Sequence, residues 1–328
     1  MGMAAGPSED TALQVKAREK CEFVQEFIRS LERALESNSQ EDRCWLRKII
    51  DPSDPCFPTL IKLFIEPKYQ SFVSLRCVAL RAAQLLLRIA AQFVAGREAD
   101  HNIGASILLN LAGDELANQA FSEVKRMALG SEPNVACNAM LLLGELGPEA
   151  FSPHLLQQLL TQLLDLFVAL PERADDLVEV ALRAHAWGGE RRAALLAKTV
   201  SHEGGQLLCE VLLQVINRAD KKRRLRAVKV LAGCLALPNS ERLLYTNDVR
   251  VLVEILLREL PNSAGDTVAF ACHADCFQAL AARCAAARAH RRDETLQVLE
   301  DLRDDDRCES MVRGKCTEVL AALAQMGA

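Results

Sequence analysis

Apolar residues between positions 249 and 260 recur at the spacing of one helix face, and this pattern constrains the fold more than any other feature. The stripe consists of Val249, Leu252, Val253, Leu256, Leu257 and Leu260. Such spacing places all the apolar groups on one side of an α-helix. The short polar side chain of Thr246, Asn247 or Asp248 can cap the first turn. Pro261 cannot continue the hydrogen-bond ladder, so we predict a helix with one buried face that stops there.

The opposite face of the same helix carries charges. Arg250, Glu254 and Arg258 are spaced four residues apart. Pairs at this spacing can form a weak ion-pair row, worth about 0.3–0.5 kcal/mol per pair. The plainer interpretation is a face that is simply solvated.

The same apolar spacing recurs in four other segments. The sets that we expect to be buried are Ala82, Leu85, Leu86 and Ile89; Ala139, Leu142, Leu143 and Leu146; Ala227, Val230, Leu231 and Cys234; and Phe277, Leu280, Ala281 and Cys284. Their intervals are irregular but compatible with a helical repeat of about 40–47 residues. Aromatic residues make up only 5% of the chain, which favours helices packed through small and aliphatic groups. The sequence therefore predicts an all-α, armadillo/HEAT-like α-solenoid.

Short breaks rich in Pro, Gly and Ser separate the helical patterns. They lie at 51–55, 147–148, 152–153, 170–171, 187–189, 204–205, 238–240 and 261–263. None is long enough for a flexible linker. We therefore expect a single armadillo-like domain over residues 10–328, beginning with a helix at about 10–36 and preceded by a disordered tail at 1–9.

A solenoid of this kind offers an extended surface suited to binding another protein. The net charge of -5 gives no overall attraction for nucleic acid, and two Trp and two Tyr supply few stacking platforms. No charged start followed by an apolar run resembles a secretory signal, and no long uncharged apolar run resembles a membrane span. The expected setting is the cytoplasm, with a protein as the partner and neither nucleic acid nor inserted membrane.

The sequence contains few candidate residues for catalysis or metal binding. Cys272, Cys276 and Cys284 fall on one helix face, which is also the core face, so we interpret them as reduced core thiols rather than as a zinc site. The 12 cysteines as a whole lack the dense spacing of small disulfide-rich domains. HExxH, GxSxG and GxxxxGK[ST] motifs are absent from the sequence. We expect no metal, no cofactor and no enzymatic activity.

Two charge runs have open interpretations. Lys221, Lys222, Arg223 and Arg224, continued by Arg226, form the densest basic run. It can contact an acidic partner or serve as a nuclear address, or it can be a solvated helix start, although basic charge at a helix amino terminus is mildly unfavourable. The acidic run at 304–306 is interpreted as a solvated turn.

The segment around residue 245 also resembles a known family. Tyr245 followed by Thr246-Asn247-Asp248, then the apolar helix with Arg258, then Gly265-Asp266, is similar to the signature of the leucine-rich domain of the WISH/DIP/SPIN (SH3-protein-interacting-with-Nck) proteins. Residues 311–320, which include Arg313 and Lys315, resemble the closing helix of that domain. The resemblance is strongest over 204–323. Members with an SH3 domain and a proline-rich region differ from this chain, which resembles the stand-alone form.

The resemblance implies a function. Members of this family bind and activate the actin-related protein 2/3 complex without a preformed filament, and the product is a linear seed filament. By resemblance, the chain is an actin nucleation-promoting factor at cortical actin sites, including those of endocytosis. The implied contact residues are Tyr245, Asn247, Asp248, Arg250, Arg258, Arg313 and Lys315, with Lys221, Lys222, Arg223 and Arg224 as a further basic contact. Tyr245 can instead be a packing residue with a hydrogen-bonded tip.

Two alternatives belong to other classes. The chain can be a generic armadillo or HEAT adaptor or scaffold, although the Trp ladder of importin-type carriers is absent because Trp45 and Trp187 are the only tryptophans. An enzyme built on the cysteines would require a reactive thiol with a low pKa, which an alkylating probe can detect.

Overall fold

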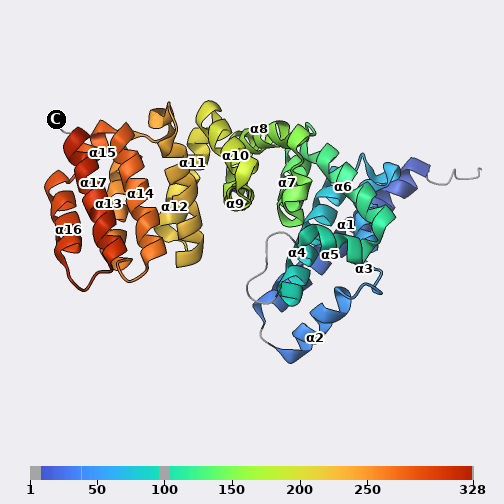
Figure 1. Cartoon of the computed structure of the whole chain (residues 1–328). Helices are drawn as coiled ribbons and strands as arrows, with labels where there is room; N and C mark the ends of the chain where they lie inside the picture. Colours follow the sequence, from blue (N-terminus) through green and yellow to red (C-terminus); the bar gives the residue numbers. More distant parts are fainter. Residues whose placement is uncertain (1–8, 38, 96–102, 327–328) are drawn as a thin grey trace, which may run out of the picture. The chain divides into compact units, whose positions relative to one another are not determined.

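A computed structural model describes residues 9–37, 39–95 and 103–326, and these form helices and connections with no β-strand. The chain divides into two compact units, residues 1–166 and 167–328 (Figure 1). The predicted all-α class is confirmed. The expectation of one domain over 10–328 stays a prediction, and the predicted tail at 1–9 lies almost wholly outside the described residues.

The first unit is organised around its central helix, α4 (Val73–Ala95). Its elements are α1 (Glu9–Glu36), α2 (Gln40–Ile49), α3 (Cys56–Ile65), η1 (Pro67–Tyr69), α4 (Val73–Ala95), α5 (Gly104–Ala112), α6 (Asp114–Ala128), α7 (Pro133–Leu146), η2 (Pro148–Ala150) and α8 (Pro153–Ala169), whose last residues cross into the second unit. Helix α4 packs against α1, α3 and α7. Its predicted stripe, from Ala82 to Ile89, is fully buried, as is the stripe of α7 from Ala139 to Leu146.

The second unit is built largely from successive helix pairs. Its elements are η3 (Pro171–Arg173), α9 (Ala174–Ala186), α10 (Gly189–Ser201), α11 (Gly204–Arg218), α12 (Lys221–Ala236), η4 (Ser240–Leu243), α13 (Thr246–Asn262), α14 (Thr267–Arg283), α15 (Ala285–Ala289), α16 (Arg292–Asp304) and α17 (Ser310–Met326). Helices α12, α14 and α17 pack side by side, and each also packs on the helix before it, α11, α13 or α16 (Figure 1). The second unit therefore has two helical layers, the arrangement expected of armadillo-like repeats.

The predicted apolar stripes form the interface between these layers. All the stripe residues of α12 and α13 are buried, and so are Phe277, Leu280 and Ala281 of α14. Cys284 differs from the prediction because α14 ends at Arg283, which leaves this thiol half-buried in the connection. Burying a large aliphatic side chain contributes about 1.5–3 kcal/mol, so these stripes account for much of the driving force.

Most of the predicted breaks coincide with helix ends, but the end of α13 was misplaced. Pro261 lies inside the last turn, and the helix continues to Asn262. The amide of Ser263 bonds to the carbonyls of Glu259 and Leu260, and its hydroxyl donates to the same two oxygens. Ser263 thus satisfies the last carbonyls, and a proline one residue before the helix end removes only one donor.

Candidate functional site

The start of α13 presents an exposed aromatic side chain. Tyr245 is the N-cap residue of α13, makes no side-chain cap hydrogen bond and is 61% exposed. Asn247 and Arg250 are also exposed, and Asp248 is half-buried. The structure does not support Tyr245 as a core packing residue. Its ring is available as a contact anchor, the alternative left open by the sequence.

The ion-pair row that the sequence left open on α13 does not form among Arg250, Glu254 and Arg258. Glu254 lies 3.1 Å from Nε2 of His290, which follows α15. Arg258 instead pairs with its neighbour Glu259 at 3.0 Å. The partners of Glu254 and Arg258 are instead a residue 36 positions away and an adjacent carboxylate. Arg250, Glu254 and Arg258 are all exposed, so the structure agrees with the plainer interpretation of a solvated face.

Glu259 joins the end of α13 to the basic run. Its side chain is 11% exposed, forms an ion pair with Nη1 of Arg224 at 2.8 Å and accepts a hydrogen bond from Nε of Arg258 at 3.0 Å. A carboxylate this deeply buried is stable only when it is paired. Arg258 belongs to α13 itself, so the pair with Arg224 is the contact that holds the end of α13 against the start of α12.

The basic run forms the first turn of α12 and is largely neutralised. Asp220 caps the helix by accepting from the amides of Lys222 and Arg223, and these bonds lower the pKa of its carboxyl group. Lys221 pairs with Asp266 at 2.9 Å. Further along, Arg223 and Arg226 share Glu179 of α9 at 2.6 and 3.3 Å. These acidic partners compensate the unfavourable charge at the helix start.

The predicted contacts on α17 are also paired. Arg313 lies 3.4 Å from Asp306. Lys315 is largely buried and contacts Asp275 of α14 at 2.7 Å and Glu318 at 2.9 Å. Burial favours the neutral amine, but hydrogen bonds to both carboxylates raise the pKa of Lys315 above its usual value. Lys315 therefore connects α17 to α14.

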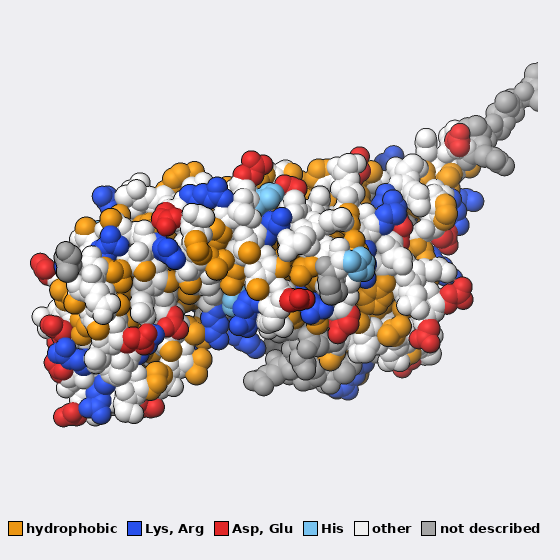
Figure 2. Space-filling model, turned by 45° about the horizontal axis from the view of Figure 1, so that its top comes forward, with side chains coloured by type: hydrophobic (Ala, Val, Ile, Leu, Met, Phe, Trp, Pro, Cys, Tyr) orange, Lys and Arg blue, Asp and Glu red, His pale blue; other side chains and the backbone are white. Residues whose placement is uncertain are grey.

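The structure does not bring the predicted contact residues into one cluster. Tyr245 and Arg258 stand near opposite ends of α13, about 20 Å apart at 1.5 Å per residue. Arg258 lies beside the basic run, and Lys315 lies between α14 and α17. Around them, acidic and basic side chains alternate over the surface of the second unit, at the left of Figure 2. Their role as a partner surface stays a prediction.

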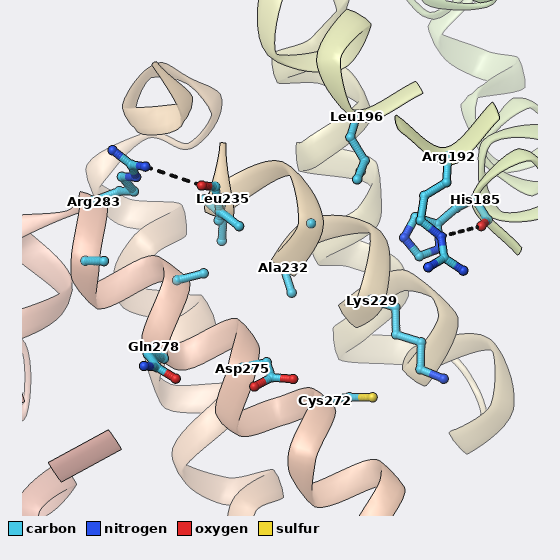
Figure 3. A pocket seen from close by; sticks show the side chains of 14 residues that line it. His185, Arg192, Leu196, Lys229, Ala232, Leu235, Cys272, Asp275, Gln278 and Arg283 are labelled. Carbon is cyan, nitrogen blue, oxygen red and sulfur yellow. Dashed lines mark hydrogen bonds between the residues drawn. The ribbon is translucent and has the colours of Figure 1, made fainter. Parts of the chain in front are cut away.

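A groove that the sequence did not reveal lies on the layer of α12 and α14 (Figure 3). It has a volume of about 800 Å³. Small residues of these helices form much of its lining: Ala232, Gly233, Ala236, Ala279 and Ala282. His185, Arg192 and Lys229 lie at one side, and Asp275 and Gln278 lie on α14. Four helices contribute to the lining, so no single sequence motif marks it.

Three thiols of α14 and the connection that follows it are held in their neutral form. Burial raises the pKa of Cys276 to about 12, and it also raises the pKa of Cys272 and of Cys284. A neutral thiol is a poor nucleophile and a poor metal ligand. Over the described ranges, no group of three or more His, Cys, Asp or Glu side chains is placed to hold a metal ion. Nor is any helix within those ranges long and apolar enough to cross a membrane.

Comparison with known proteins finds a family match within the second unit. Residues 180–300 match the family model for the SPIN90/Ldb17 leucine-rich domain. No protein in the curated set matches the chain. The crystal structure of an engineered protein, a Northeast Structural Genomics Consortium target, is 17% identical with a TM-score of 0.43, and the match covers 82% of this chain and 96% of that one. The family match therefore confirms the resemblance found around residue 245, whereas the resemblance at 311–320 lies outside the matched residues and stays a prediction.

Proposed function

Because the chain carries a leucine-rich domain of the SPIN90/Ldb17 family, we propose that it is an actin nucleation-promoting factor that binds and activates the actin-related protein 2/3 complex. The family fits an actin-related adaptor role. The finer proposal is that activation needs no preformed filament and yields linear seed filaments. The family match over 180–300 is the observation that carries the proposal.

The matched segment supports a binding role through its construction. It runs from the middle of α9 into α16 and contains the helix pairs α11–α12 and α13–α14. Its apolar side chains are mostly buried in packing, while Tyr245, Asn247 and Arg250 remain exposed. Aromatic and arginine side chains supply most of the binding energy at protein interfaces. The start of α13 is therefore the contact surface favoured here.

The proposed mechanism is a shift in a conformational equilibrium. A ligand changes such an equilibrium only through its preference for one state. The second unit would therefore bind the filament-like arrangement of the complex more tightly than its splayed arrangement. No bond is made or broken by this chain under the proposal, and it would work in the cytoplasm at cortical actin sites such as those of endocytosis.

The test is bulk polymerisation of fluorescent actin with the purified complex and this protein, without other activators or filament seeds. The expected result is faster assembly that depends on both components, with unbranched filaments under the microscope. Tyr245→Ala and Arg250→Glu should weaken binding and activation, because both side chains are exposed and neither is needed for folding.

A matched control distinguishes the loss of a specific contact from a general effect of reversing a surface charge. Arg292→Glu makes the same charge change at an exposed position in the first turn of α16. It should leave activation unchanged. If Arg250→Glu and Arg292→Glu behaved alike while both stayed folded, the assignment to α13 would be wrong. No acceleration together with no binding of the complex would refute the nucleation proposal and leave a generic helical-repeat adaptor.

A further inference from the structure

The groove on α12 and α14 has a cationic end, where the Nη nitrogens of Arg192, the amine of Lys229 and the ring of His185 have no partner among the described residues. Arg192 uses its Nε to donate to the carbonyl of His185 at 3.0 Å, and both of its Nη nitrogens point toward the opening (Figure 3). Lys229 is exposed and forms no ion pair in the described part of the chain. His185 is only 9% exposed, yet its ring lines the groove without a hydrogen bond there.

The packing of α10 on α12 fixes this cationic end. Leu196 lies against Gly233, where an added Cβ would come within 2.8 Å of the leucine Cδ1. Arg192 is one helical turn before Leu196 and so lies on the same face of α10. The close approach that Gly233 permits therefore holds Arg192 over the groove beside Lys229 of α12.

The charge of the groove contrasts with that of the chain. The chain has a net charge of -5, but the groove is lined by three cationic side chains, Arg192, Lys229 and Arg283, and one carboxylate. That carboxylate, Asp275, is already paired with Lys315 at 2.7 Å. At the far end, Arg283 donates to the carbonyl of Ala236 at 3.3 Å. No carboxylate among the described residues pairs with Arg192, Lys229 or Arg283, and two of these three cations, Arg192 and Lys229, lie together at one end of the groove.

The remaining lining has room for apolar side chains. Ala232, Gly233 and Ala236 of α12 line the groove together with Ala279 and Ala282 of α14, so nothing larger than a methyl group projects from these positions. A polypeptide that alternates acidic and small apolar residues would match both parts of the groove. Its carboxylates would meet the cations, and its apolar side chains would cover the alanines.

We propose that this groove is a second binding site, which takes an acidic, extended segment of a partner protein and holds a carboxylate between Arg192, Lys229 and the ring of His185. The site is separate from the start of α13, and the proposal does not depend on actin nucleation.

The state of His185 agrees with an anion site. Burial and the charges of Arg192 and Lys229 lower the pKa of its ring to about 4, so the ring is neutral at pH 7. A carboxylate bound beside the ring would offset the two cations. Binding of an acidic peptide should therefore raise the pKa of His185, an effect that contact elsewhere on the molecule would not produce.

The test uses the full chain and a fluorescein-labelled peptide of alternating Leu, Asp, Ala and Glu. The reference peptide has Asn and Gln in place of Asp and Glu. Fluorescence polarisation should show saturable binding of the acidic peptide and at least about tenfold weaker binding of the amide peptide. Histidine-ring NMR should show an upward shift of the His185 pKa in the complex.

Two charge reversals decide whether the groove is responsible. Lys229→Glu should weaken binding of the acidic peptide about tenfold or more, since an attractive charge becomes a repulsive one. Lys198→Glu makes the same change on α10, outside the groove lining, and should alter binding less than about twofold. Equal effects of the two variants would overturn the proposal, as would no binding of the acidic peptide. Equal affinity for an oligouridine of the same charge would also overturn it, because the site would then be a general polyanion surface.

Discussion

Glu259 offers the sharpest test of how the second unit is held together. Its carboxylate forms ion pairs with Nη1 of Arg224 at 2.8 Å and with Nε of Arg258 at 3.0 Å, and only 11% of the side chain is exposed. Replacement by Gln keeps the shape and one acceptor oxygen but removes the negative charge. Arg224 is then left 24% exposed, with a buried Nε that already lacks a hydrogen bond.

The expected cost follows from this partial burial. Removing one partner of a fully buried ion pair costs about 3–5 kcal/mol. Arg224 is about one quarter exposed and Arg258 about one half, so water can recover part of the loss. We therefore expect Glu259→Gln to lower the free energy of unfolding by about 2–3 kcal/mol. For a unit of this size, the midpoint of thermal unfolding should fall by about 5–10 °C.

The assay is urea and thermal unfolding followed by circular dichroism. Glu318→Gln is the matched control, because Glu318 is 55% exposed and its partner Lys315 keeps Asp275. Glu318→Gln should lower the free energy of unfolding by less than about 0.5 kcal/mol. Adding Arg224→Met to Glu259→Gln should recover part of the stability, since it removes the stranded charge. Equal costs for the two carboxylate variants would refute the reasoning.

Three further predictions concern single side chains. Burial and two nearby cations lower the pKa of His185 in the folded protein to about 4, below the usual 6.5, so its contribution to stability is complete above pH 6.5 and is lost as the pH falls toward 4. Between pH 7 and pH 5, urea unfolding should show that the wild type loses up to about 2 kcal/mol more unfolding free energy than His185→Gln. Gly205→Ala should severely destabilise or prevent folding, because the added Cβ would stand 1.8 Å from the carbonyl oxygen of Thr199, and circular dichroism with expression yield will report this. With iodoacetamide at pH 7.5, mass spectrometry should find exposed Cys44 alkylated well before Cys276, whose pKa is raised to about 12; early modification of Cys276 would contradict its burial.

The helices of this chain could be predicted because their signals are local. The stripe from Val249 to Leu260 needs only the period of an α-helix, and its residues are buried as predicted. The position of a helix end depends on the interactions of fewer atoms, so the ends were predicted less accurately than the helices. Ser263 completes the last turn of α13 through bonds that a helix-breaking rule for Pro261 does not include.

The candidate sites depend on residues distant in sequence, and so sequence reasoning reached them only in part. The basic run was noticed, but its partners Glu179 and Glu259 lie more than one helix away. The groove was missed because His185, Arg192 and Lys229 come from three helices whose neighbourhood follows only from packing. The alanines of α12 and α14, which the sequence alone does not distinguish from other helix-forming residues, line this groove.

The measurement that tests the central claim most directly is the affinity of this protein for the purified actin-related protein 2/3 complex, followed by actin assembly in the same mixture. The account predicts saturable binding and rapid growth of unbranched filaments without seeds, with both effects reduced in Arg250→Glu and retained in Arg292→Glu. Absence of binding by the folded wild-type protein, with no change in the rate of assembly, would contradict it.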